Sequence, residues 1–149
     1  MTITAPFPSD AWFSALVATA TGDADALERL GIADLRFAVE VIEPSGAARL
    51  FGIVFDGYDV TSVGEVTEAS FVPEVIVSGP LDAWTEMIAS IEACGHADTA
   101  HSLNSLTIFG TPLFMRAPDP MGADKFFRFM GTLQELFDQV GRSPVVAGG

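Results

Sequence analysis

The chain contains few of the residue types from which metal and catalytic sites are most often built. Its 149 residues include one cysteine, Cys94, and two histidines, His96 and His101. A lone cysteine excludes an intrachain disulfide and a multi-cysteine metal site, and it is typical of a reducing compartment. The histidines are five residues apart, whereas a helical zinc site needs ligands at i and i+4. The sequence therefore predicts no metal site.

Glycine is present, but not in the arrangement that binds phosphate. Five glycines lie at expected strand ends and turns, without the spacing of a nucleotide-binding loop. They are Gly46, Gly52, Gly57, Gly64 and Gly79. We expect no nucleotide cofactor, and no other cofactor is indicated.

Positive charge is scarce. Seven Lys and Arg residues oppose 20 Asp and Glu residues, which gives a net charge of −13, and Lys125 is the only lysine. The arginines are scattered along the sequence as Arg29, Arg36, Arg49, Arg116, Arg128 and Arg142. Nucleic acids and anionic membranes are bound by clustered Lys and Arg. Neither is an expected partner.

Long apolar runs are missing as well. The longest uncharged run, residues 99–115, is interrupted by Asn104, Gly110 and Pro112, so we expect no stable membrane insertion. Residues 1–9 have neither a basic segment nor a continuous apolar segment. This pattern predicts no secretory signal and favours a cytoplasmic location.

The chain is nevertheless rich in apolar residues. Hydrophobic residues make up 49% of the sequence and the mean hydropathy is +0.39, which predicts a packed core in spite of the charge. The length suits one domain. We expect a single domain over residues 1–142 and a flexible tail over residues 143–149.

Hydrophobic periodicity divides the first half into helices followed by strands. Ser9 is an expected N-cap for a helix over residues 10–20, and a second short helix is expected over residues 23–30. The period then changes to two over residues 34–42. Two more strands, residues 48–55 and 58–63, flank the turn dipeptide Asp56-Gly57, which predicts an antiparallel meander.

The second half predicts one more strand, two short apolar runs and two helices. Residues 71–77 are an expected fourth strand, in which Pro73 indicates an edge or a bulge. A helix is expected from Gly79-Pro80 to Cys94. Apolar runs at residues 106–109 and 113–115 are expected to complete the sheet.

The final helix has the clearest signals. Asp119 is an expected cap and Pro120 lies near the first helical position, so the pattern predicts one helix to Gly141 about 33 Å long. The fold class is therefore α+β. We expect a single, mainly antiparallel sheet of about five strands that packs against helices, with the long C-terminal helix closing an apolar cavity.

Carboxylates and phenylalanines are the residues that suggest a function. Asp56, Asp59 and Glu65 beside an apolar cavity would have raised pKa values, which suit proton abstraction by a small isomerase or hydrolase. Turn formation and solvation explain the same residues equally well. The chain also has 12 Phe against one Tyr. Such residues can line a pocket for an apolar ligand or form an ordinary core.

Several segments resemble the sterol carrier, or nonspecific lipid-transfer, domain family. They are residues 51–58 (FGIVFDGY), residues 75–81 (VIVSGPL) leading into Trp84, and residues 103–110 (LNSLTIFG) before the closing helix. The resemblance covers about residues 10–140. Residues 126–129 (FFRF) and the helix after Asp119 are similar to small stand-alone bacterial members.

The resemblance implies noncatalytic binding or carriage of a fatty acyl, steroid or similarly apolar molecule in an internal cavity. The expected wall residues come from two helices, and neutral or basic polar residues between them are candidates for the ligand's head group. The walls are Trp84, Ile88, Ile91, Phe126, Phe129, Met130 and Leu133, and the polar candidates are His101, Asn104 and Arg116. Eukaryotic carriers of this family are typically basic, so the acidic charge disfavours transfer at anionic membranes.

Two alternatives remain open at this point. The first is the carboxylate enzyme, and the second is a homodimeric interaction module whose apolar surface binds a second copy instead of a ligand.

Overall fold

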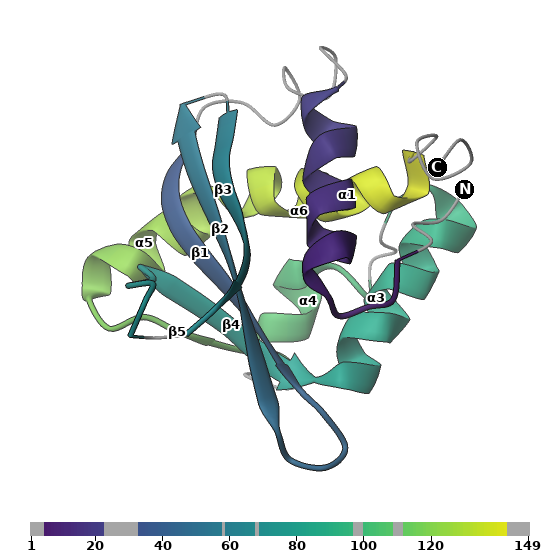
Figure 1. Cartoon of the computed structure of the whole chain (residues 1–149), viewed down its shortest axis with the longest axis horizontal. Helices are drawn as coiled ribbons and strands as arrows, with labels where there is room; N and C mark the ends of the chain where they lie inside the picture. Colours follow the sequence, from purple (N-terminus) through teal and green to yellow (C-terminus); the bar gives the residue numbers. More distant parts are fainter. Residues whose placement is uncertain are drawn as a thin grey trace.

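A computed structural model describes residues 5–22, 33–57, 59–67, 69–96, 100–108 and 112–142. Five strands form one sheet in the order β3-β2-β1-β4-β5, and the helices α1, α3, α4 and α6 lie to one side of it (Figure 1). The strands are β1 (Ala33–Ile42), β2 (Ala48–Gly57), β3 (Asp59–Val66), β4 (Val75–Pro80) and β5 (Phe114–Arg116). The helices are α1 (Asp10–Thr21), α3 (Leu81–Cys94), α4 (Leu103–Thr107), α5 (Pro120–Arg128) and α6 (Met130–Asp138), followed by the 3-10 turn η1 (Gln139–Arg142).

The predicted meander is confirmed. Strand β1 pairs with β2 in antiparallel register from Ala33 opposite Gly57 to Ile42 opposite Ala48. Strand β2 pairs with β3 in the same sense, with a bulge between Val54 and Phe55. Alternate residues of β1 enter the core and their neighbours face the other side of the sheet, as a period of two requires.

The expected strand at residues 71–77, with an edge or a bulge at Pro73, is corrected in its start and in its place in the sheet. The strand starts at Val75, and it lies between β1 and β5, with a parallel pairing to β1 and an antiparallel one to β5. The preceding segment crosses the outer face of the sheet, where the Phe71 ring would lie 2.9 Å from a Cβ on Gly52. A hairpin would bring the next strand back antiparallel to its neighbour. The crossover instead places β4 beside β1 with the same chain direction, so these two strands pair in parallel.

Two predictions in the second half are also corrected. The apolar run at residues 106–109 belongs, as far as it is described, to α4 and the residue after it, because Ser102 caps a helical turn by accepting a hydrogen bond from the Ser105 amide. Pro80 is the N-cap of α3 and not its first residue. The run at residues 113–115 is confirmed as a strand through β5.

The predicted single closing helix is divided in two. Asp119 caps α5 and Pro120 is its first residue, as expected, but Phe129 leaves the helical region at φ −103° and ψ 12°. Helix α5 buries Phe126 on one side of the break, and α6 buries Leu133 and Phe137 on the other.

The core lies between the helices and the inner face of the sheet. Phe13 of α1 stacks on Phe51 of β2 with ring centroids 4.6 Å apart, and Trp84 of α3 stacks on Phe137 of α6 at 5.9 Å. A smaller cluster on the outer face contains Ala38, Leu50, Phe71 and Ile76. The expected helix at residues 23–30 and the expected tail at residues 143–149 lie outside the described residues.

Two glycines near the break offer a stability test. A Cβ on Gly122 would lie 1.8 Å from the Glu74 backbone oxygen, whereas a Cβ on Gly131 would meet nothing within 4 Å. We predict that Gly122→Ala lowers the free energy of unfolding by about 2 kcal/mol or more, because a backbone atom has to move. Gly131→Ala should raise it by about 0.5 kcal/mol. Urea unfolding of both variants measures the difference, and equal effects would contradict this packing of α5.

Candidate functional site

Most of the predicted wall residues lie in the core. Trp84, Ile91 and Leu133 have no exposed surface, and Ile88 is buried as well. The Trp84 indole Nε1–H donates to the Glu40 backbone oxygen at 3.2 Å. Side chains therefore fill the space around these four residues, and their role as ligand walls stays a prediction.

One pocket contains two of the predicted residues, Asn104 and Phe126. It lies between α4, β5 and α5, has a volume of about 140 Å³, and is referred to below as the α4–α5 pocket. Its lining side chains are Asn104, Thr107, Ile108, Met115, Phe126 and Phe127. Three short elements from separate parts of the sequence thus contribute to one site.

The α4–α5 pocket runs from the core to the surface through apolar side chains. Phe126 is fully buried, whereas Ile108 is 63% exposed and Phe127 is 64% exposed. The two phenylalanine rings lie 5.6 Å apart in an edge-to-face arrangement. Exposed large apolar side chains that adjoin a pocket are typical of a binding surface.

The other predicted residues do not line this pocket, and Arg116 lines a different one together with Val72, Pro73, Ile76 and Pro118. His101 is half-buried directly before the cap of α4, and Phe129 and Met130 are partly buried against the core. The Arg116 guanidinium lies 3.6 Å from the Glu40 carboxylate. The sequence analysis missed Thr107, Ile108, Met115 and Phe127. Helical spacing does not separate Phe127 from Phe126, because adjacent residues of one helix are both buried elsewhere in the chain, as with Leu136 and Phe137.

Glu74 holds α5 against the sheet. Its carboxylate accepts hydrogen bonds from Lys125 Nζ of α5 at 2.6 Å and from the Arg36 amide of β1 at 2.9 Å. Burial raises the pKa of Glu74, but these bonds and the attraction of both cations outweigh it, so the net pKa is below the usual 4.5. The hydrogen bond to Glu74 raises the pKa of Lys125. Both groups are therefore charged at neutral pH.

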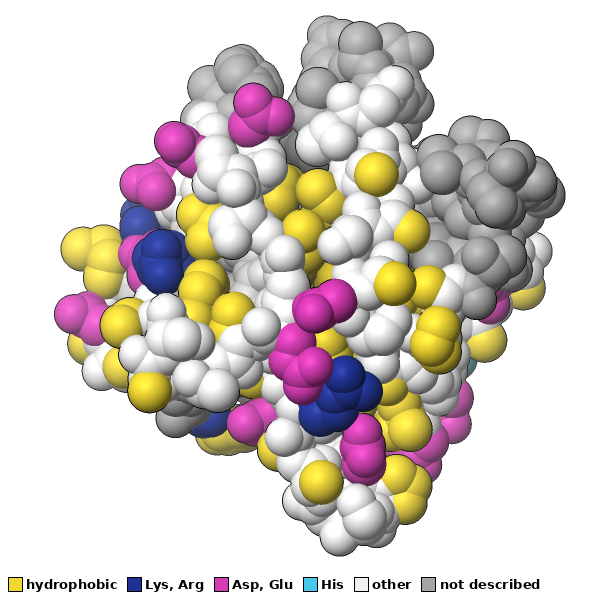
Figure 2. Space-filling view, in the orientation of Figure 1, with side chains coloured by type: hydrophobic (Ala, Val, Ile, Leu, Met, Phe, Trp, Pro, Cys, Tyr) yellow, Lys and Arg dark blue, Asp and Glu magenta, His cyan; other side chains and the backbone are white. Residues whose placement is uncertain are grey.

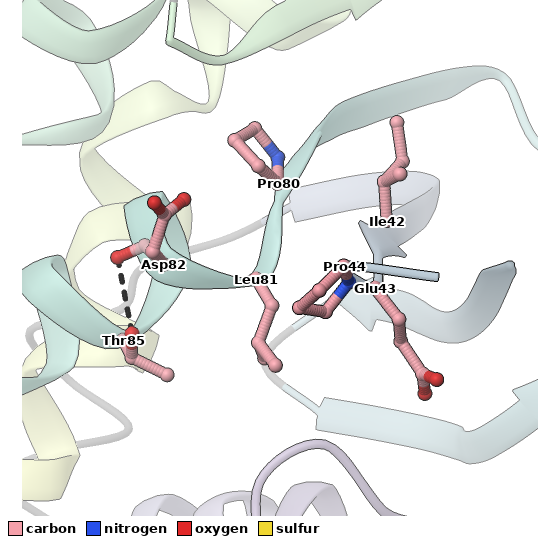
Figure 3. Close-up of a pocket in the computed structure, with 7 residues that line it drawn as sticks. All are labelled: Ile42, Glu43, Pro44, Pro80, Leu81, Asp82 and Thr85. Atoms are coloured by element: carbon pink, nitrogen blue, oxygen red, sulfur yellow. Dashed lines mark hydrogen bonds between the residues drawn. The ribbon is translucent and has the colours of Figure 1, made fainter. Parts of the chain in front are cut away.

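Several further pockets lie on the surface of the described residues. The first lies between the end of β1 and the first turn of α3, measures about 370 Å³, and has Ile42, Pro44, Pro80 and Leu81 beside Glu43, Asp82 and Thr85. Figure 3 shows Thr85 donating to the Asp82 backbone oxygen, and the Glu43 carboxylate directed away from α3. We refer to it as the α3 pocket.

The second is an outer-face groove of about 450 Å³, lined by Arg36, Val72, Pro73, Glu74, Pro118, Asp119, Met121 and Gly122. Neither this groove nor the α3 pocket contains a predicted site residue.

The carboxylate enzyme is not favoured by the positions of its residues. Asp56 and Asp59 face each other across the exposed β2–β3 turn. Glu65 accepts two hydrogen bonds from Arg49, at 2.9 and 3.1 Å. The hydrogen bond from Arg49 lowers the pKa of Glu65, the opposite of what proton abstraction near neutral pH requires. Within the described residues, no group of His, Cys, Asp and Glu is arranged to hold a metal ion.

Acidic side chains accompany the few cations on the surface. On the face in Figure 2, the Lys and Arg side chains form small separate groups, each beside Asp or Glu. Arg49, which lies near both Glu43 and Glu65, is one such case. Hydrophobic surface is interspersed over the same face (Figure 2).

Solved structures match this fold over nearly the whole chain. The crystal structure of sterol carrier protein 2 superposes with a TM-score of 0.70 at 12% sequence identity, covering 93% of this chain and 99% of the other. The chain has the sterol carrier protein fold. The α+β architecture expected from the sequence is thereby confirmed.

Two further structures with the sterol carrier fold agree. A conserved hypothetical protein of Thermus thermophilus, described as a possible sterol carrier protein, gives a TM-score of 0.63 at 12% identity, with 98% and 96% of the two chains covered. The apo form of Yarrowia lipolytica sterol carrier protein 2 gives 0.53 at 13% identity, with 90% and 98% covered. The sequence matches no family model, and no curated protein is similar to it.

In this version of the sterol carrier fold, the described helices include none that is both long and apolar enough to cross a membrane.

The Glu74–Lys125 contact predicts a specific pH dependence. Because the folded pKa of Glu74 is depressed, its contribution is fully present above the unfolded value and is lost as pH falls through the folded pKa. Glu74→Gln should therefore lower stability at pH 7 by about 1 kcal/mol and flatten the loss of stability below about pH 4.5. Chemical unfolding across pH measures both effects. Glu86→Gln, an exposed charge loss on α3, is the control, and an identical profile for the two variants would refute the contact's role.

Proposed function

We propose that this chain binds or carries an apolar small molecule without catalysing a reaction on it, and that the molecule enters through the α4–α5 pocket. The observation that supports this most is the continuous apolar path from buried Phe126 to exposed Phe127 and Ile108. Sterol carrier proteins with the same fold make a fatty acyl, steroid or similar lipid the ligand class to test first.

The size of the α4–α5 pocket constrains how binding takes place. Pockets for drug-sized ligands usually measure about 300–1,000 Å³, whereas this one measures about 140 Å³. It accommodates one end of such a molecule. A whole lipid requires α5 to move away from α4, and the non-helical Phe129 between α5 and α6 is where that movement would be absorbed.

Apolar burial would supply most of the affinity. Each Å² of ligand surface removed from water contributes about 25 cal/mol, and part of this gain is offset by the lost freedom of the ligand and the ordering of α5. The residues of α3 and α6 that the sequence predicts as ligand walls lie in the core here. They would contact the ligand only after α5 has moved away from α4. This explains why Trp84, Ile88, Ile91 and Leu133 are closely packed in the closed structure.

Cargo exchange at an anionic membrane is not part of the proposal. The net charge of −13 opposes approach to such a surface. Sequestration, or delivery to another protein, fits this charge better. The homodimer hypothesis stays a prediction.

A pair of pocket-filling variants tests the site. Thr107→Phe places a ring in the α4–α5 pocket, and Thr85→Phe does the same in the α3 pocket. We predict that native mass spectrometry detects a 1:1 complex of the wild-type protein with oleyl alcohol. Thr107→Phe should weaken this complex at least tenfold, because the added ring occupies the space for the ligand. Thr85→Phe should leave the complex unchanged.

Thermal unfolding of both variants checks that the fold is retained. If Thr85→Phe alone loses binding, the ligand binds in the α3 pocket instead. Absence of any complex, in the wild-type protein as in the variants, would refute the proposed function.

A further inference from the structure

Among the described residues, the lining of the α4–α5 pocket contains no ionisable side chain. Four of its residues are apolar, and the other two, Asn104 and Thr107, are neutral hydrogen-bonding residues. The α3 pocket, in contrast, includes Glu43 and Asp82, and the outer-face groove includes Arg36, Glu74 and Asp119. The α4–α5 pocket therefore suits a different kind of ligand from the α3 pocket and the outer-face groove.

The cations closest to this pocket along the chain are engaged elsewhere. Arg128, next to Phe127, bonds to Asp124 and lies 5.7 Å from the centroid of the Phe129 ring. Lys125, next to Phe126, bonds to Glu74.

Arg116, next to Met115, lies against Glu40 at 3.6 Å. An anionic head group would therefore have to break one of these interactions or remain uncompensated, in a chain whose net charge is −13.

The two neutral residues suit a neutral head group. The Thr107 hydroxyl donates to the Leu103 backbone oxygen at 2.6 Å, which leaves its own oxygen free to accept a hydrogen bond. Asn104 is exposed, and its side-chain amide makes no hydrogen bond to other residues of the described chain. An amide both donates and accepts. Together these groups complement a hydroxyl or a carbonyl.

We infer that the α4–α5 pocket selects apolar ligands with a neutral polar end, such as a hydroxyl or an ester carbonyl, over ligands with the same tail and a carboxylate. The inference rests on the proposed function and names its ligand class. Asn104 is the residue that determines this specificity, because its amide lies on the pocket lining at an exposed position of α4.

Two probes with one tail test the preference. Oleyl alcohol and oleate are each used to displace the neutral fluorophore N-phenyl-1-naphthylamine from the full chain, at about pH 8, where dissolved oleate is ionised. Both are kept below their aggregation concentrations. The expected result is at least tenfold tighter binding of oleyl alcohol.

A charge variant assigns the preference to Asn104. Asn104→Lys places a cation on the pocket lining and should shift the oleyl alcohol to oleate affinity ratio at least fivefold towards oleate. Thr61→Lys makes the same change in net charge at an exposed position of β3, at the opposite edge of the sheet from β5. It should leave the ratio unchanged.

The possible outcomes distinguish failure of the inference from failure of the proposed function. Equal wild-type affinities for the two probes, or equal shifts in the two lysine variants, would overturn the inference while leaving the proposed function intact. Binding of neither probe, with no uptake of the fluorophore, would overturn the proposed function and the inference with it.

Discussion

The contact between α5 and Glu74 determines where the candidate site lies. Gly122 brings the helix backbone against the Glu74 carbonyl, and one turn later Lys125 bonds to the Glu74 carboxylate. The same carboxylate accepts a hydrogen bond from the Arg36 amide, which joins the central strand β1 to the helix. With α5 held in this position, the next residue after Lys125 is buried and the one after that faces solvent. The α4–α5 pocket follows from this placement of Phe126 and Phe127.

The break at Phe129 has the complementary role. It ends the segment that Glu74 holds and lets α6 turn its own apolar face towards α1 and α3. Helix α5 is attached to the rest of the fold by the buried Phe126, by the close approach of Gly122 to Glu74, and by the Glu74–Lys125 contact. The proposed displacement of α5 would break all three contacts.

Local sequence signals predicted the elements that local chemistry controls. Ser9 and Asp119 cap their helices because a side-chain oxygen satisfies a free amide, and the alternation over residues 34–42 predicted β1 because one face of that strand is buried. The parallel pairing of β4 and the break at Phe129 depend on contacts between distant residues, such as Phe71 with Gly52 and Gly122 with Glu74. Local sequence patterns do not report such contacts. They therefore predicted a strand from residue 71, with an edge or a bulge at Pro73, and one long closing helix.

The same distinction explains the candidate site. Asn104 and Phe126 were predicted because they lie in segments that resemble sterol carrier domains, and the pocket contains both. Met115 and Thr107 were missed because only the packing of β5 and α4 brings them next to α5. Trp84 and Leu133 were assigned to a cavity, but an apolar side chain on a cavity wall and one in a core have the same helical spacing.

The most direct test of ligand binding at the α4–α5 pocket is a titration of the ¹⁵N-labelled protein with oleyl alcohol, followed by amide NMR spectra. We predict that the largest chemical-shift changes fall in α4, β5 and α5, with further changes at Phe129 and in α6 as α5 moves. Changes confined to residues 42–44 and 80–85, or no changes at saturating oleyl alcohol, would contradict it.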